Sequence, residues 1–459
     1  MNELIKRPVD QGILPRILGR FDLVTIYFTL IFGSYGAAQL AGKGWAGISM
    51  LLLAVVTFLI PCALASYELG TLFPGEGGIY MWAKKTLGIK HGFIAGWLSW
   101  VPVFLLLPLI STTIVAHIQF IFSIKFPLWY QVILQVAVIW IIYLISIKKL
   151  KFSQGYVRIL SIVAFATAGI AYGVAMIKGH SVNPINREIF SLDLNKYGTL
   201  YSAAILWLLG VEVPYNMGDE FSEHKKTAGS MILWGSLALV IAYIFGIIGV
   251  LYTTSLDQVN PTIGIAQGVA NVYPILGIVV AFLICLAVSS QGVAYMNAYS
   301  RLLFVSGLEK CLPESYGNIS KNKIPTKAML VQVIGATIVL IIFSTQANLV
   351  IAFNLYLAAL VAVWCASLFY IYIGVVLARR NLKHEYEERG ENIWKLPFGK
   401  IGLWFTAIWG FFFNMVAIYY VFANPWVDGI SKSSWMLWLS IISFVVVASG
   451  TVVFKLNRK

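Results

Sequence analysis

Twelve long apolar stretches follow one another along this chain of 459 residues. A helix that crosses the hydrocarbon core of a bilayer needs about 20 mostly apolar residues, and each stretch is long enough for one. No connecting segment is large enough to form a separate soluble domain. We therefore expect an all-α membrane protein, with a single transmembrane domain over residues 1–459. The expected twelve transmembrane helices are residues 22–42, 47–70, 92–122, 128–147, 155–177, 198–218, 229–253, 273–304, 328–344, 348–378, 401–422 and 434–454.

The sixth stretch is interrupted. Gly210, Glu212 and Pro214 lie within five positions of one another in a segment that is otherwise apolar. Glycine makes local unwinding cheap, and proline removes a backbone donor and clashes with the preceding helical turn. Inside a membrane, freed carbonyls and a carboxylate are tolerated only where they line a cavity or meet a partner. The break therefore predicts a binding site in the middle of the membrane.

The first stretch has a matching interruption at Gly33-Ser34-Tyr35-Gly36, five helices earlier. Discontinuous helices at corresponding positions of two halves are typical of transporters built from inverted repeats. We therefore expect a five-plus-five inverted repeat, with helices 1–5 over residues 22–180 and helices 6–10 over residues 198–378. Two extra helices follow over residues 401–454.

Composition and charge support this picture. The chain is 59% hydrophobic and 11% charged, whereas soluble domains carry roughly 25% charged residues. Twelve spans place both termini on one side, and the lysines and arginines gather there, which predicts a cytoplasmic location for both termini and for residues 1–21. The net charge of +14 is thus explained by topology, and we expect no nucleic-acid partner. All but six of the 33 lysines and arginines lie on that side, the exceptions being Lys43, Lys125, Lys178, Arg187, Lys196 and Lys432.

Catalysis and metal binding are not indicated. The four cysteines, Cys62, Cys285, Cys311 and Cys365, show neither metal-ligand spacing nor a disulfide framework. An enzyme of this class would need clustered Asp, His or Cys residues at a membrane face, or large loops, and the chain has neither. We therefore expect no catalytic residues, no metal and no cofactor.

Three sequence motifs stand out from the apolar pattern. Residues 67–80 read Y-E-L-G-T-L-F-P-G-E-G-G-I-Y and are followed by the glycine-marked run 92–97, which ends in G-W. Residues 300–303 read S-R-L-L and precede Leu312-Pro313. The G-V-E run at 210–212 is followed by an acidic pair at 219–220. Together these motifs cover the chain from the first span to the ninth, and they resemble those of the amino acid–polyamine–organocation superfamily of transporters.

The resemblance implies a leucine-transporter-type fold, in which the broken first and sixth helices hold an amino acid or amine at the membrane midplane. In such folds helices 1, 2, 6 and 7 rock against helices 3, 4, 8 and 9. Residues expected to face the substrate carboxylate are Gly33, Ser34, Tyr35 and Gly36. Residues expected to supply carbonyls and pocket walls are Leu206, Trp207, Leu208, Leu209 and Gly210. Tyr35 stands where many members have a glycine, so it narrows the pocket or hydrogen-bonds the ligand.

Four residues are candidates for gating or coupling. Glu212 binds a cation, shuttles a proton, or braces the break by accepting backbone N–H bonds, and we favour the brace. Tyr295 is a gate over the substrate or a packing residue. Ser289 and Ser290 form either a second-site hydroxyl pair or a close helix contact, and we favour packing. The fifth stretch lacks the lysine of many proton-coupled members, which favours exchange or coupling to another cation.

We therefore expect an amino acid transporter of the plasma membrane that works by alternating access. The expected mode is exchange of a neutral or glutamate/γ-aminobutyrate-like amino acid, as in the glutamate–γ-aminobutyrate antiporter branch that the sixth-span motif resembles. The expected partners are the small-molecule substrate and the lipid bilayer, and the expected state is a monomer or homodimer. A proton- or cation-coupled symporter of amino acids or polyamines, and an amino acid sensor with a transporter fold, remain alternatives.

Overall fold

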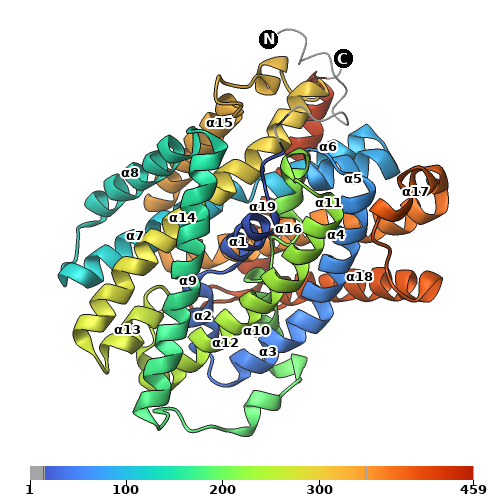
Figure 1. The fold of residues 1–459 in the computed structure, drawn as a ribbon. Coiled ribbons are helices and arrows are strands. Elements are labelled where there is room, and N and C mark those ends of the chain that lie inside the picture. Colours follow the sequence, from blue (N-terminus) through green and yellow to red (C-terminus); the bar gives the residue numbers. More distant parts are fainter. Residues whose placement is uncertain (1–13, 15, 347–348, 458–459) are drawn as a thin grey trace.

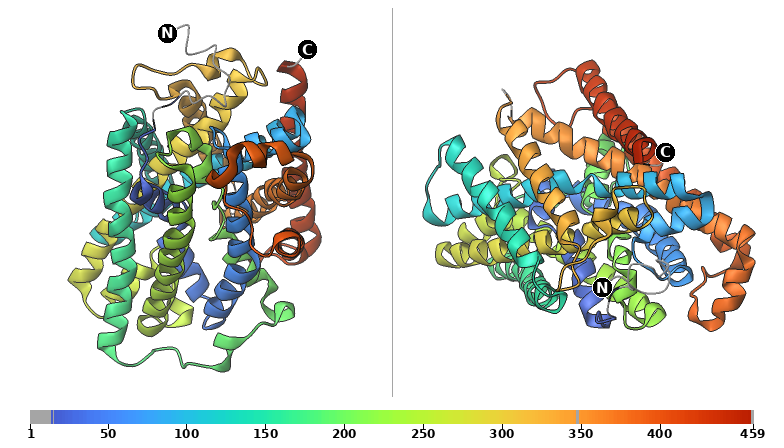
Figure 2. Two further views of the ribbon diagram at one scale, coloured as in Figure 1. Left: turned by 45° about the vertical axis from the view of Figure 1, so that its right-hand side comes forward. Right: turned by 90° about the horizontal axis from the view of Figure 1, so that it is seen from above.

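The computed structural model describes residues 14, 16–346 and 349–457, and within these ranges the chain folds into helices without any β-strand. Within these ranges, ten helices are long and apolar enough to cross a membrane, or eleven if a bent pair near the N-terminus counts as one span. The prediction of an all-α protein with many membrane-spanning helices is therefore confirmed. The long helices cross one another at different angles: α9 stands upright in Figure 1, whereas α18 lies nearly across it (Figures 1 and 2).

The first half of the chain follows the apolar pattern closely, with one addition. The first span is bent by 45° at the break between α1 and α2, and a π-helical turn, Val55–Leu59, joins α3 to α4 within one span. The addition is α5 (Gly78–Leu87), a short helix where the sequence predicted only a connection. The other helices are α1 (Arg20–Ile31), α2 (Ser34–Ala41), α3 (Ala46–Ala54), α4 (Ile60–Leu72), α6 (Ile89–Trp100), α7 (Val103–Phe122), α8 (Leu128–Ser146) and α9 (Leu150–Lys178).

The second half contains the remaining long helices and three short ones. A second π-helical turn, Met231–Gly235, joins α11 to α12. The helices are α10 (Leu194–Leu206), α11 (His224–Ser230), α12 (Ser236–Thr253), α13 (Gly264–Ala270), α14 (Pro274–Leu308), α15 (Thr326–Ser344), α16 (Leu349–Asn381), α17 (Lys383–Arg389), α18 (Gly399–Ala423) and α19 (Lys432–Asn457).

The sixth expected span differs from its prediction. It is α-helical only in α10, and residues 207–223 form turns and two 3₁₀ helices, η5 (Val213–Asn216) and η6 (Gly218–Glu220). Gly210 has a φ of +114°, a conformation that favours glycine, and Pro214, the second residue of η5, has no backbone N–H to donate. The segment is thus unwound well beyond the five positions at which the sequence predicted the break. Because α10 is too short to span alone, the described residues contain ten or eleven candidate spans instead of twelve.

Most residues of the bent first span are buried against other helices. α1 occupies the centre of the view in Figure 1, with α8 towards one side and α18 towards the other. α9 packs against α12 and α14, and α14 packs against α7. Only 11% of the apolar stretch of α19 is buried, which leaves its apolar side chains facing outward as contact with lipid requires.

Candidate binding site

The break in the first span exposes backbone groups that must find partners, and α12 supplies one of them. Phe32 and Gly33 separate α1 from α2. The Tyr243 hydroxyl on α12 donates to the carbonyl of Ile31 at 2.8 Å and accepts the N–H of Gly33 at 3.2 Å. One buried side chain thus satisfies groups on both sides of the break, as buried backbone polar groups require.

α14 supplies the other partners. The Gln291 amide donates to the carbonyls of Phe32 at 3.2 Å and Leu30 at 3.4 Å, and the Tyr295 hydroxyl donates to the Leu30 carbonyl at 2.5 Å. The Gln291 carbonyl oxygen accepts the Tyr35 hydroxyl at 2.9 Å. Gln291 therefore connects the end of α1 with the first turn of α2.

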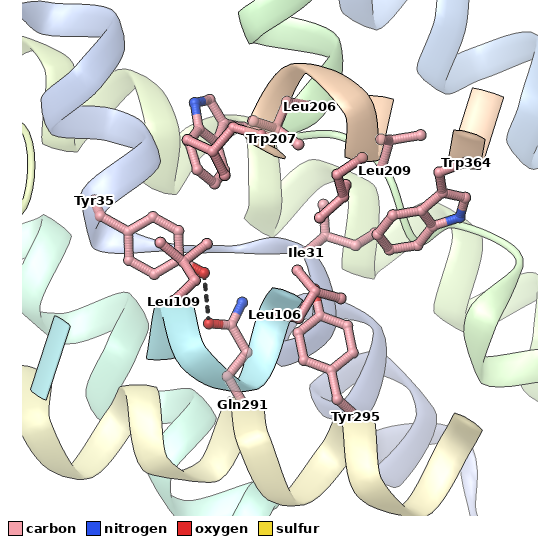
Figure 3. A pocket seen from close by; sticks show the side chains of 12 residues that line it. Ile31, Tyr35, Leu106, Leu109, Leu206, Trp207, Leu209, Gln291, Tyr295 and Trp364 are labelled. Atoms are coloured by element: carbon pink, nitrogen blue, oxygen red, sulfur yellow. Dashed lines mark hydrogen bonds between the residues drawn. The ribbon is translucent and has the colours of Figure 1, made fainter. Parts of the chain in front are cut away.

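A narrow cavity lies between this break and the unwound segment that follows α10. Figure 3 shows Tyr35, Gln291, Tyr295, Trp207 and Trp364 converging on it from different parts of the chain. The free space holds only about one water molecule, so the walls must separate before an amino acid can enter. Its lining carries no Asp, Glu, Lys or Arg and consists of Ile31, Tyr35, Leu106, Leu109, Leu206, Trp207, Leu209, Gln291, Tyr295, Leu357, Leu360 and Trp364.

Five residues singled out from the sequence line this cavity: Tyr35, Leu206, Trp207, Leu209 and Tyr295. Tyr35 and Trp207 meet edge to face, with their ring centroids 5.0 Å apart. The Trp207 indole also donates to the side chain of Gln39 on α2 at 3.0 Å. The two interrupted segments, far apart in sequence, therefore contact each other through these aromatic rings.

The glycines of the first break allow this close approach. A Cβ atom on Gly33 would lie 2.6 Å from the Tyr35 ring, and one on Gly36 would lie 2.8 Å from the Trp207 ring. Ser34 instead lines a second small cavity with Thr29 and residues of α9 and α14, and its buried hydroxyl has no hydrogen-bond partner. Leu208 and Gly210 are buried in the unwound segment without lining the first cavity.

Ser289 and Ser290 lie on α14 outside both cavities. The Ser289 hydroxyl bonds the Tyr156 hydroxyl of α9 at 2.5 Å and the carbonyl of Leu286 at 2.6 Å. Ser290 donates to the carbonyl of Ala287 at 2.7 Å. Both hydroxyls are thus occupied by helix contacts in this conformation.

Glu212 lies fully buried in the unwound segment, with side-chain partners on two other helices. One carboxylate oxygen accepts the Trp364 indole N–H of α16 at 2.7 Å and the Ser99 hydroxyl of α6 at 3.4 Å. The other oxygen has no partner. Glu212 therefore ties the break to α16 and α6 through side chains, where the sequence had suggested backbone N–H groups.

Three residues of the site were not singled out from the sequence. Tyr243, Gln291 and Trp364 come from helices that contain no break, so the interruptions gave no signal for them. In the sequence, Gln291 is a polar residue in an apolar run next to two serines, and nothing there connects it with the first break. Its role became visible once the structure placed it beside Phe32 and Tyr35.

Comparisons with known proteins agree with this architecture. A model of the family described as amino acid permease matches residues 18–447. A glutamate/γ-aminobutyrate antiporter of Lactococcus lactis subsp. lactis is 23% identical over 449 residues, which cover 90% of this chain and 85% of that protein. A probable agmatine/putrescine antiporter of the same organism is 26% identical over 254 residues, 54% of each protein, so the chain spans about half the length of that relative.

A solved structure shows the same fold. A manganese transporter of Eremococcus coleocola superposes with a TM-score of 0.60 at 13% sequence identity, covering 96% of this chain and 93% of that one. At this identity the likeness concerns the fold alone. The family match, in contrast, extends over nearly the whole chain, includes both interrupted segments, and confirms the resemblance seen in the motifs. The protein is a multi-pass membrane transporter that belongs to the amino acid permease family.

Proposed function

We propose that this transporter exchanges neutral amino acids across the plasma membrane by alternating access. The observation that carries the proposal is the cavity between the two interrupted segments, α1–α2 and residues 206–210, where Tyr35 and Trp207 meet. Both segments are unwound at the same place, and unwound backbone inside a membrane is tolerated where it lines a cavity. This arrangement is what a midplane substrate site between two repeats requires.

The backbone at this cavity offers groups for both ends of an amino acid. The first N–H groups of α2, at Ser34 and Tyr35, have no acceptor within the helix, and the positive end of the helix dipole lies there. These groups suit a substrate carboxylate, while Gly33 contributes less because its N–H is already bound by Tyr243. Carbonyls at the end of α10 and in residues 207–210 suit the ammonium group.

The lining of the cavity favours a neutral side chain on the substrate. It contains no charged residue, so a second cationic group, as on a polyamine, would meet no carboxylate there. A second carboxylate, as on glutamate, would equally meet no cation. A charge moved from water into such a site without a partner costs several kcal/mol or more. Leucine-like amino acids therefore fit this site better than the charged or dicationic compounds named for two of its relatives.

The proposed topology retains twelve spans in a five-plus-five inverted repeat with two extra helices. α10 together with residues 207–220 would form the sixth, largely unwound span. The distribution of lysine and arginine supports cytoplasmic termini. The segment after α4, the residues after η5 and the C-terminal end of α14 then lie on the cytoplasmic side.

Counterflow in proteoliposomes tests this function. Vesicles loaded with unlabelled leucine, glutamate, γ-aminobutyrate or putrescine are offered the same labelled compound, with and without a proton or sodium gradient. We expect uptake to be driven by an internal neutral amino acid alone. Uptake that requires a gradient would replace exchange by symport, and binding without any uptake would indicate a sensor.

A matched pair of variants tests whether exchange depends on the cavity. Leu106→Trp enlarges a lining residue of α7 and is expected to abolish exchange. Leu144→Trp adds the same bulk on α8, where the side chain is 53% exposed on the outer surface, and is expected to leave exchange unchanged. Equal activity of the two variants would place the transport pathway elsewhere.

A further inference from the structure

Two loops meet backbone to backbone on the side of the molecule that we assign to the cytoplasm. The Gly77 N–H donates to the Asn216 carbonyl at 2.9 Å, and Glu76 forms an antiparallel bridge with Met217. The approach is so close that a Cβ atom on Gly218 would lie 2.2 Å from a backbone oxygen of the opposite loop. We call this contact between residues 73–78 and 216–220 the seam. It joins the end of the second span to the end of the sixth.

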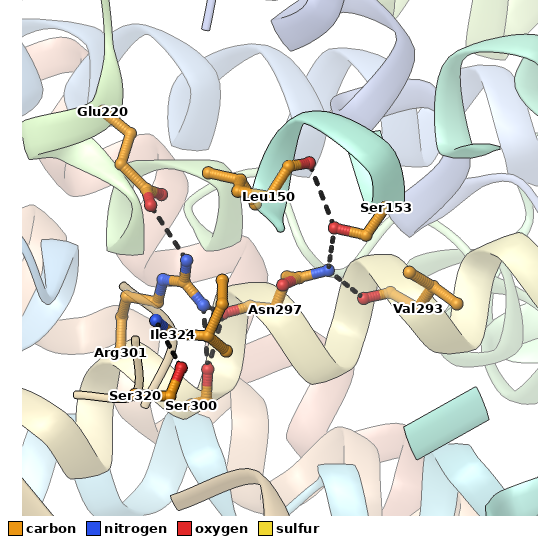
Figure 4. Close-up of polar contacts among 9 residues, drawn as sticks. All are labelled: Leu150, Ser153, Glu220, Val293, Asn297, Ser300, Arg301, Ser320 and Ile324. Carbon is orange, nitrogen blue, oxygen red and sulfur yellow. Dashed lines mark hydrogen bonds and ion pairs between the residues drawn. The ribbon is translucent and has the colours of Figure 1, made fainter. Parts of the chain in front are cut away.

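α14 covers the seam with a buried ion pair. The Arg301 guanidinium, with 0% of its side chain exposed, donates to the Glu220 carboxylate at 2.9 Å. The same guanidinium also donates to the Asn297 carbonyl at 2.9 Å and to the Ser300 hydroxyl at 3.1 Å (Figure 4). Arg301 is therefore fixed from several directions, and one carboxylate is enough to neutralise it.

Glu76 differs from the other charged residues at the seam because its carboxylate is buried without hydrogen bonds. Its side chain is 1% exposed, and neither of its carboxylate oxygens has a hydrogen-bond partner. Asp219 and Glu220 act on it as like charges, and Arg301 is the single opposing charge. An ionised carboxylate that is buried without hydrogen bonds carries a large desolvation cost, which the binding of one proton removes.

The charged groups on the neighbouring elements are engaged elsewhere. Lys84 of α5 binds Glu309 at 2.7 Å, and Lys85 lies 3.8 Å from Glu385. Arg20 of α1 lies 3.7 Å from Glu223, and Arg16 is exposed. Burial and, after it, the charges of Glu220 and Asp219 therefore hold the pKa of Glu76 well above its usual range, against the opposing effect of Arg301.

A metal ion does not fit this cluster. Within the described ranges, no group of three or more His, Cys, Asp or Glu side chains is arranged to hold one. A proton needs only a single carboxylate, and Glu76 offers two oxygens free of competing hydrogen bonds.

We propose that Glu76 is a proton-binding site of the inner gate, protonated while the seam is closed and ionised when the seam opens. The role of the seam as a gate rests on the transport function proposed above. When residues 73–78 and 216–220 separate, water reaches Glu76, and its proton passes from the carboxyl oxygen to that water. Closing takes one proton back from the same side, so no net proton crosses the membrane in a complete exchange cycle.

The direction of the pH effect follows from linkage. Glu76 has the higher pKa in the closed state, so its protonation stabilises the closed seam fully at pH values below the ordinary pKa of glutamate. This stabilisation is lost as the pH rises through the raised pKa of the closed state. Acid on the cytoplasmic side therefore holds the seam closed and slows exchange. Between the two pKa values the ratio of closed to open seam changes by up to about tenfold per pH unit.

Hydrogen–deuterium exchange of residues 73–78 and 216–220 tests the site without relying on transport. In micelles between pH 5.5 and 8.5, after correction for the intrinsic pH dependence of amide exchange, we expect protection of both segments to fall as the pH rises. Glu76→Gln, which imitates the protonated form, should keep high protection throughout. Glu314→Gln, which removes an exposed acidic group that pairs with the exposed Lys310, should follow the unmodified protein. Protection that does not depend on pH, or a Glu76→Gln profile equal to that of the unmodified protein, overturns the proposal.

Glu76→Asp and a parallel counterflow series complete the test. Glu76→Asp keeps a titrating group, so its protection should remain pH-dependent even if Glu76→Gln does not fold. In counterflow, the unmodified protein should slow at acidic pH and Glu76→Gln should show a flat profile. pH-dependent protection without exchange of any amino acid would retain the proton site and reject the transport function. Amino acid exchange without pH-dependent amide protection would support the transport function and reject the proton site.

Discussion

Replacing Tyr243 by phenylalanine tests whether the break between α1 and α2 depends on hydrogen bonds from α12. The Tyr243 hydroxyl binds Ile31 O at 2.8 Å and the Gly33 N–H at 3.2 Å. Phenylalanine keeps the fully buried ring and its contact with Phe32, whose ring centroid is 5.1 Å away, and removes the hydroxyl alone. The substitution therefore leaves one carbonyl and one N–H at the break without this partner.

The expected loss follows from these two groups. A buried polar group that is left unsatisfied costs about 1–3 kcal/mol. Because the break borders the cavity, where one water can bind in place of the hydroxyl, we expect the free energy of unfolding to fall by about 2–4 kcal/mol. Tyr27→Phe is the matched control, since Tyr27 is equally buried and joins α1 to Ser236 of α12 by one bond of 2.8 Å. The serine can turn to a carbonyl of its own helix, so the control should lose only about 0.5–1.5 kcal/mol.

Equilibrium unfolding in mixed micelles with increasing SDS fraction, followed by circular dichroism, measures both losses. Counterflow at the same temperature shows whether the break still supports exchange. If Tyr243→Phe loses no more stability than Tyr27→Phe, the hydroxyl does not hold the break. The account of how α12 and α14 satisfy the interrupted backbone would then be wrong.

Substitutions at three further residues address the other contacts. Gly36→Ala places a Cβ atom 2.8 Å from the Trp207 ring, so counterflow should show reduced exchange, with overpacking costing about 1–3 kcal/mol; unchanged exchange would mean that the ring moves freely. Gly218→Ala puts a Cβ atom 2.2 Å from a backbone oxygen across the seam, and we expect hydrogen exchange there to accelerate at every pH; intact protection would contradict the close approach. Glu212→Ala leaves the Trp364 indole N–H without its acceptor and should lower stability in the SDS assay by about 1–3 kcal/mol, whereas Glu212→Gln keeps an acceptor and should lose less; equal losses would exclude this bond as the cause.

The sequence was sufficient for the fold wherever one long apolar stretch forms one helix. The expected span 128–147 corresponds to α8 (Leu128–Ser146), because nothing in that stretch competes with helix formation. It was insufficient for residues 207–223, because glycine and proline show that a helix stops, and the surrounding structure decides whether it resumes. α5 was also missed, since a short helix with lysines in its last turn does not resemble a membrane span.

The candidate site was predicted where a residue adjoins an interruption and missed where it lies on an intact helix. Tyr35 and Trp207 were found because they flank the two breaks, and the structure places both at the cavity. Gln291 and Tyr243 satisfy the backbone of the first break from helices that are continuous. Their importance depends on which groups α1 loses at Phe32, and that pairing is a property of the tertiary structure.

The contacts of Glu212 hold the break in place and still allow the motion that transport requires. In the proposed cycle the sixth span moves against the third, so a rigid link between them would oppose opening. The bond from Ser99 of α6 in the third span is long, at 3.4 Å, whereas the bond from Trp364 of α16 is short, at 2.7 Å. Separation of the cavity walls therefore breaks the weaker contact first and leaves the carboxylate bound to the indole. Glu212 can thus remain paired while the cavity opens, which avoids the cost of a buried carboxylate that has lost every partner.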